Sequence, residues 1–140
     1  MTFDKIRTHH ITAFFENSHD SVLGVVYRPE FENHLCRFFE NNQAHDNDVA
    51  WYALRNAVYA VGCRSAAALE NNKDFVAIQQ ESVQYFHNAF SVHLDLLYMP
   101  SGLVAIQALV VMVSSLKISY VARTELYKDL LRRASGELSC

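Results

Sequence analysis

The chain has 140 residues, 51% of them hydrophobic and 12% aromatic, which favours one folded domain with a sizeable core and disfavours disorder. Its formal net charge of −3 provides no strong overall field that would attract nucleic acid. The three cysteines are widely spaced, which disfavours a disulfide framework and favours a reducing compartment. The N-terminal residues lack the apolar core of a secretory signal peptide, so we expect no secretory leader.

Helices dominate the predicted secondary structure. With four glycines and two prolines, the chain has little material for tight β-turns, and no segment has a convincing strand pattern. We therefore predict an all-α fold of about six helices, packed as antiparallel helical pairs.

The first two predicted helices flank an extended connector. In residues 2–17, apolar and aromatic side chains recur every three or four positions, which is the period of a helix. The connector covers residues 22–27, because a residue before a proline avoids the helical region of backbone space. Pro29 then opens a helix that runs to about residue 41, since proline is well tolerated in the first helical turn. Its apolar stripe comprises Phe31, Leu35, Phe38 and Phe39.

The third predicted helix covers residues 49–69 and has Asp48 as its N-cap. Between Trp51 and Cys63 it is apolar on almost every side, which is typical of a central, buried helix. Gly62 lowers the helix propensity and indicates a close crossing with another helix.

The remaining sequence predicts three more helices. The fourth covers residues 75–98 and ends at Pro100, and the fifth covers residues 102–116, with Ser101 as its cap. The apolar run in this fifth helix contains Gln107 and is too short for the roughly 20 residues of a membrane span, so we expect a buried core helix. The sixth covers residues 117–140, with Gly136 suited to the position after its C-terminal end.

Catalytic and metal-binding patterns are weak. His87 and His93 are six residues apart, which places them on different sides of a helix, and no cysteine pair has zinc-site spacing. Cys36 and Cys63 lie in apolar helical stretches, so we expect buried thiols that no base activates. Nucleotide-binding and nucleophile motifs are missing from the sequence. We therefore predict no enzymatic activity, no catalytic residue, no metal ligand and no cofactor. Most aromatic residues belong in the core, and the rest would line an apolar effector pocket.

Three stretches, taken in order, resemble one known family. They are AFFENSHDSVLGVVYRPEFENHL, LRNAVYAVGCRSA and YFHNAFSVHLDLLYMPSGLVAIQALVVMVSSL. Together they resemble the N-terminal part of the fungal-specific transcription factor domain, the middle homology region of zinc-cluster transcription factors. The resemblance covers roughly residues 10–116, and the residues that carry the motif in a structural role are Phe14, Phe15, His19, Arg28, Pro29, Phe31, Tyr85, Phe86, Pro100, Ser101 and Gln107, with Ala89, Ala108 and Leu109 also matching.

The resemblance implies a nuclear, non-catalytic regulatory domain that modulates transcription through protein or effector contacts. The six-cysteine zinc cluster with which that family binds DNA has no counterpart here, so DNA contact would be indirect and no membrane is involved. Residues 1–116 would be a partial regulatory domain, and residues 117–140 a divergent C-terminal helix or tail. One alternative is a stand-alone helical interaction module that associates with a full-length relative. Another is a small helical enzyme with an apolar pocket.

Overall fold

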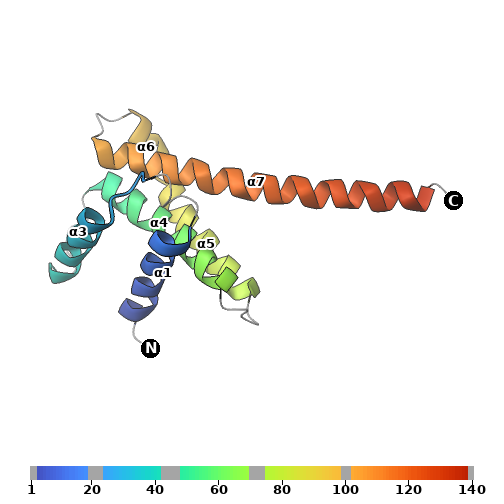
Figure 1. The fold of residues 1–140 in the computed structure, drawn as a ribbon. Coiled ribbons are helices and arrows are strands. Elements are labelled where there is room, and N and C mark those ends of the chain that lie inside the picture. Colours follow the sequence, from blue (N-terminus) through green and yellow to red (C-terminus); the bar gives the residue numbers. More distant parts are fainter. Residues whose placement is uncertain (1–2, 19–23, 42–47, 70–74, 99–101, 139–140) are drawn as a thin grey trace.

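The computed structural model describes residues 3–18, 24–41, 48–69, 75–98 and 102–138. These residues form six α-helices and no strand (Figure 1). The helices are α1 Phe3–Asn17, α3 Arg28–Glu40, α4 Val49–Leu69, α5 Phe75–Phe90, α6 His93–Tyr98 and α7 Leu103–Leu138. The predicted all-α fold is confirmed. Of the residues singled out from the sequence, His19, Pro100 and Ser101 lie outside the described ranges.

Helix α4 is the centre of the molecule. It packs against α1, α5 and α7, and every residue from Ala53 to Cys63 is buried. Its partners are equally well covered at the contact, and Phe14 of α1 and Val111 of α7 are among the largest fully buried side chains. The nearly uniform apolar composition of α4 therefore reflects neighbours on several sides, as predicted.

Two of the helix starts follow from single residues. Tyr27 is extended, with φ −85° and ψ 114°, and Pro29 lies in the first turn of α3. At the start of α4, the backbone N–H groups of Ala50 and Trp51 donate to Asp48 Oδ1 at 3.1 and 3.2 Å. Both starts were predicted correctly, because each depends on local chemistry alone.

Gly62 is the point at which α1 crosses α4. A β-carbon at this position would lie 2.7 Å from the carbonyl carbon of His10 and 3.3 Å from its Cα. Both separations are shorter than an ordinary van der Waals contact, so only glycine allows the two backbones to approach this closely. The predicted close crossing is confirmed.

The predicted helix of residues 75–98 is interrupted. Helix α5 ends at Phe90, and α6 starts at His93. At the break, Ser91 Oγ donates to the carbonyl of Asn88 at 2.7 Å, and Val92 N–H donates to the carbonyl of Ala89 at 3.4 Å. A serine hydroxyl that bonds a nearby carbonyl competes with the helical pattern, which explains why an uninterrupted stripe did not produce one helix.

The fifth and sixth predicted helices form one helix, α7, of 36 residues. At about 1.5 Å per residue it is roughly 54 Å long. Its first part lies across the other helices, and its second part projects away from them (Figure 1). The sequence contains no proline in α7 and no glycine before Gly136, so nothing local stops the helix at residue 116. Gly136 lies inside α7, and its predicted place after the helix end was wrong.

The structure also corrects one cysteine. Cys36 is exposed on α3, whereas Cys63 is buried in α4. Burial, followed by the negative charge of Glu81, raises the pKa of the Cys63 thiol to about 12. The thiol is therefore neutral at physiological pH, and its Sγ donates to the carbonyl of Ile78 at 3.6 Å. Among the helices that the structure describes, none is both long enough and apolar enough to span a bilayer.

Candidate functional site

Helix α7 is apolar on two opposite faces. The inner face contacts α4 and buries Ala105, Ala108, Val111 and Met112. The outer face carries Leu103, Ile106, Val110 and Val113, with 38–66% of each residue exposed. Because a helix turns about 100° per residue, these two sets lie on opposite sides of it. The predicted buried core helix is therefore buried on one side only.

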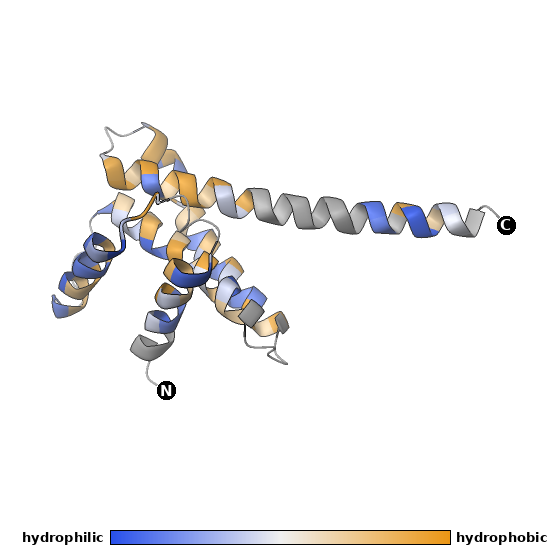
Figure 2. Cartoon of the chain, in the orientation of Figure 1, coloured by the Kyte–Doolittle hydropathy of each residue, from blue (hydrophilic) through white to orange (hydrophobic). Residues whose placement is uncertain are grey.

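Helix α6 extends this exposed apolar area. It contacts α7, buries Leu96, and exposes Leu94, Leu97 and Tyr98 by 54–85%. In Figure 2, hydrophobic colouring covers α6 and the adjoining first part of α7. We call the outer residues of both helices the α6–α7 apolar surface: Leu94, Leu97, Tyr98, Leu103, Ile106, Val110 and Val113.

The α6–α7 apolar surface is large for a protein of this size. Taking about 150–220 Å² for such a residue when fully exposed, the exposed fractions correspond to roughly 700–800 Å². The largest apolar patch of a typical monomer is about 300–600 Å², and patches above that range mark interaction sites. Residues 103–116 contain no charged side chain that would repel an apolar partner.

A small cavity lies near the start of α3. Its volume is about 30 Å³, and its walls include Tyr27, Phe31, His34, Trp51 and Gln107. The His34 ring stacks on the Trp51 ring with centroids 3.9 Å apart and an interplanar angle of 3°. A cavity of this volume has room for about one water molecule, whereas small-molecule sites occupy about 300–1,000 Å³. It is too small for the effector pocket predicted from the aromatic content.

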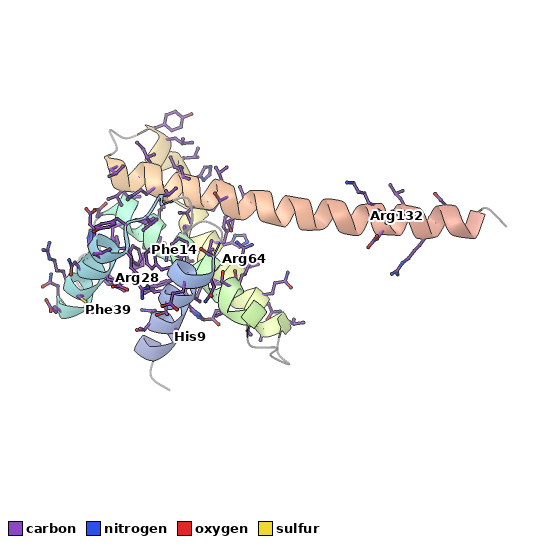
Figure 3. All side chains as sticks on the ribbon, in the orientation of Figure 1. His9, Phe14, Arg28, Phe39, Arg64 and Arg132 are labelled. Atoms are coloured by element: carbon purple, nitrogen blue, oxygen red, sulfur yellow. The ribbon has the colours of Figure 1, made fainter. Side chains whose placement is uncertain are left out.

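Four of the motif residues come together between α1 and α3. Phe14 contacts Phe15 edge to face, with ring centroids 5.0 Å apart, and Phe15 contacts Phe31 at 5.8 Å. Arg28 bonds Glu32 at 2.8 Å, lies 3.5 Å from Glu16, and places its guanidinium 5.5 Å from the Phe15 ring centroid. Figure 3 shows Phe14 within the body of the molecule. These contacts hold α3 against the end of α1.

The other described motif residues lie elsewhere. Gln107 Nε2 on α7 donates to the carbonyl of Val25 at 2.9 Å and so joins α7 to the connector before α3. On α5, the Tyr85 hydroxyl donates to Glu81 Oε1 at 3.4 Å, and the Phe86 ring stacks on Phe90 with centroids 5.9 Å apart. The motif residues thus connect helices in separate places and do not form one binding site.

Comparisons with known protein families, with curated proteins and with solved structures find no match to this chain. The resemblance to the fungal regulatory domain therefore stays a prediction from the sequence.

Proposed function

We propose that this chain is a non-catalytic helical interaction module that self-associates through the α6–α7 apolar surface and acts in transcription regulation. The observation that carries the first part is the apolar outer face of α7, exposed beside the equally apolar exposed face of α6. The second part rests on the sequence resemblance alone.

A second copy of the same surface is the proposed occupant. Leu103, Ile106, Val110 and Val113 are spaced by three, four and three residues, the spacing with which two helices interdigitate along a seam. A standard protein interface buries about 800 Å² on each partner, which matches the area exposed here. A two-fold dimer would bring identical apolar faces together without opposing like charges.

Oligomeric state tests the interaction. We expect the purified chain to form a concentration-dependent dimer in sedimentation velocity experiments. Val113→Glu should shift it to the monomer, because a carboxylate would be buried without a partner. Val76→Glu is the matched control: Val76 is 68% exposed, similar to Val113 at 63%, but lies on α5 outside the surface. A wild-type chain that remains monomeric at high micromolar concentration, or equal effects of both substitutions, would contradict self-association.

The transcriptional role has a separate test. The full chain, expressed in a fungal host, should accumulate in the nucleus. Tethered to a heterologous DNA-binding domain, it should change reporter transcription through the proteins that it binds. The Val113→Glu variant should lose this effect, and Val76→Glu should retain it. Dimer formation without nuclear accumulation or reporter change would favour the stand-alone interaction module over the transcriptional role.

A further inference from the structure

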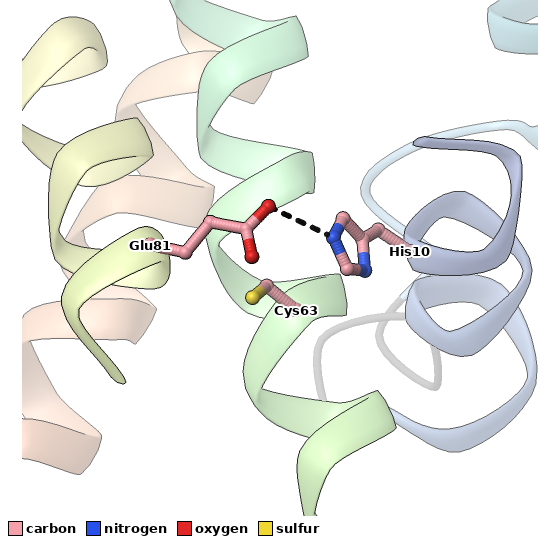
Figure 4. Close-up of side chains that lie close together, drawn as sticks. All are labelled: His10, Cys63 and Glu81. Carbon is pink, nitrogen blue, oxygen red and sulfur yellow. Dashed lines mark hydrogen bonds and ion pairs between the residues drawn. The ribbon is translucent and has the colours of Figure 1, made fainter. Parts of the chain in front are cut away.

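Three side chains with metal-binding atoms converge between α1, α4 and α5. They are His10, Cys63 and Glu81, one from each helix, and their ligand atoms all lie within 4.8 Å of one another (Figure 4). His10 Nε2 lies 3.4 Å from Glu81 Oε1. His10 and Cys63 are 7% and 1% exposed, whereas 43% of the Glu81 side chain is open to solvent.

The surrounding contacts hold all three helices in place. Gly62, next to Cys63, lies against the His10 backbone and fixes α1 on α4. Ser82, next to Glu81, donates from its buried hydroxyl to the carbonyl of Ala60 at 2.8 Å and fixes α5 on α4. The Tyr85 hydroxyl donates to Glu81. Hydrogen bonds of this last kind orient a carboxylate ligand and are typical of built metal sites.

The distances suit a tetrahedral ion. Zinc binds histidine nitrogen and carboxylate oxygen at about 2.0–2.2 Å, so two such ligands on one tetrahedral ion lie about 3.4 Å apart. That is the observed separation of His10 Nε2 and Glu81 Oε1. Moving the Cys63 sulfur into the third position requires a shift of about 1 Å, because Zn–S bonds are about 2.3 Å long.

We infer that His10, Cys63 and Glu81 bind one zinc ion, which joins α1, α4 and α5. A thiolate, an imidazole and a carboxylate are the donor types that zinc prefers, and they exclude magnesium and calcium as preferred ions. The exposed side of Glu81 provides the entry path, and a water molecule completes the fourth position. On binding, the Cys63 thiol gives up its proton to solvent, the S–H···O bond to Ile78 is replaced by a Zn–S bond, and no electron is transferred.

Cobalt provides the most direct test, because a cobalt–thiolate bond has its own absorption band in the near ultraviolet. Chelator-treated protein titrated with Co²⁺ should develop this band and saturate at one ion per chain, and Zn²⁺ should displace the cobalt. Cys63→Ser should abolish the band. Cys36→Ser is the matched control, since it removes an exposed cysteine outside the cluster and should leave the band unchanged.

Glu81→Gln keeps the test decisive if Cys63→Ser impairs folding, because Glu81 is partly exposed and the amide has the same size. It should weaken zinc binding at least tenfold, measured by competition with a chelating dye, whereas Glu30→Gln on α3 should have no effect. In the wild type, saturating Zn²⁺ should raise the melting temperature. An unchanged affinity in Glu81→Gln, or a wild-type chain without the thiolate band, would overturn the zinc site and leave a simple histidine–glutamate ion pair.

Discussion

At the residue scale, Gly62 is the position where the smallest change has the largest structural consequence. Gly62→Ala gains about 1 kcal/mol of helix propensity, but its methyl group would meet the His10 backbone, which cannot rotate away. We expect α1 and α4 to separate, with a net loss of about 1–3 kcal/mol in the free energy of unfolding. Urea unfolding monitored by circular dichroism measures this loss.

Gly136→Ala is the control for the same substitution. Gly136 also lies in a helix, but a β-carbon there meets nothing within 4 Å. The propensity gain should then appear without opposition, and the protein should become no less stable. Equal stability changes at both glycines would show that the crossing of α1 and α4 tolerates a side chain.

Tyr59 predicts how stability depends on alkaline pH. Its burial raises the pKa of the phenol above its ordinary value of 10.0, against the opposing charges of Arg55 and Arg7. The contribution of the neutral phenol is complete below pH 10.0 and is lost as the pH rises through the higher pKa of the folded state. The free energy of unfolding should therefore fall above about pH 10, and Tyr59→Phe should make that fall shallower. Urea unfolding at several pH values tests this, and identical slopes would contradict it.

At the element scale, α7 has two parts with different roles. Its described buried residues all lie between Ala105 and Ser115, whereas the described side chains from Lys128 to Gly136 are exposed. Arg132 and Asp129 form only a surface ion pair with N and O 3.7 Å apart (Figure 3). The projecting end therefore contributes little to the stability of the body.

A chain ending at Tyr127 should melt within about 3 °C of the full chain, because exposed residues away from special features change stability by about 0.5 kcal/mol or less. Met112→Ala, on the buried face of the same helix, should instead cost about 2–5 kcal/mol. Thermal melts of the three proteins provide the comparison. A large loss on truncation would mean that the projecting end has a partner within the folded chain or its dimer.

The sequence predicted well whatever depends on near neighbours. Pro29 and Asp48 set helix starts through their own backbone chemistry, and the apolar composition of α4 predicted its central place. The break at Ser91 was missed because a hydroxyl bond to a carbonyl has no periodic signature. The spacing from Leu103 to Val113 is visible in the sequence, but hydrophobicity alone does not say which face another helix covers.

His10, Cys63 and Glu81 illustrate the opposite limit. They are 53 and 18 residues apart along the chain, so no short spacing motif contains them. Their convergence depends on two helix crossings, one at Gly62 and one at Ser82. A sequence pattern reports ligands on one helix or loop, but a site with one ligand from each of three helices becomes visible only in the fold.

At the scale of the whole molecule, the zinc cluster and the α6–α7 apolar surface have no residue in common. The cluster joins α1, α4 and α5, whereas the surface is made by α6 and α7. One contact approaches both, since Arg64 beside Cys63 donates to Ser115 Oγ at 2.5 Å on the inner side of α7. Val113 is two residues from Ser115, so Ile106 is the better position for testing whether the two features are independent.

Independent features should have additive effects, within about 0.5 kcal/mol. Ile106→Glu should make the protein monomeric and yet leave the zinc-induced rise in melting temperature as large as in the wild type at equal chain concentration. Glu81→Gln should remove that rise and leave the dimer intact. Melting curves with and without Zn²⁺, together with sedimentation velocity on both variants and the double variant, measure all of these effects. If Ile106→Glu also abolished the zinc response, the ion would be bound only in the dimer, and α4, which contacts every helix involved except α3 and lies between the two features, would transmit the change.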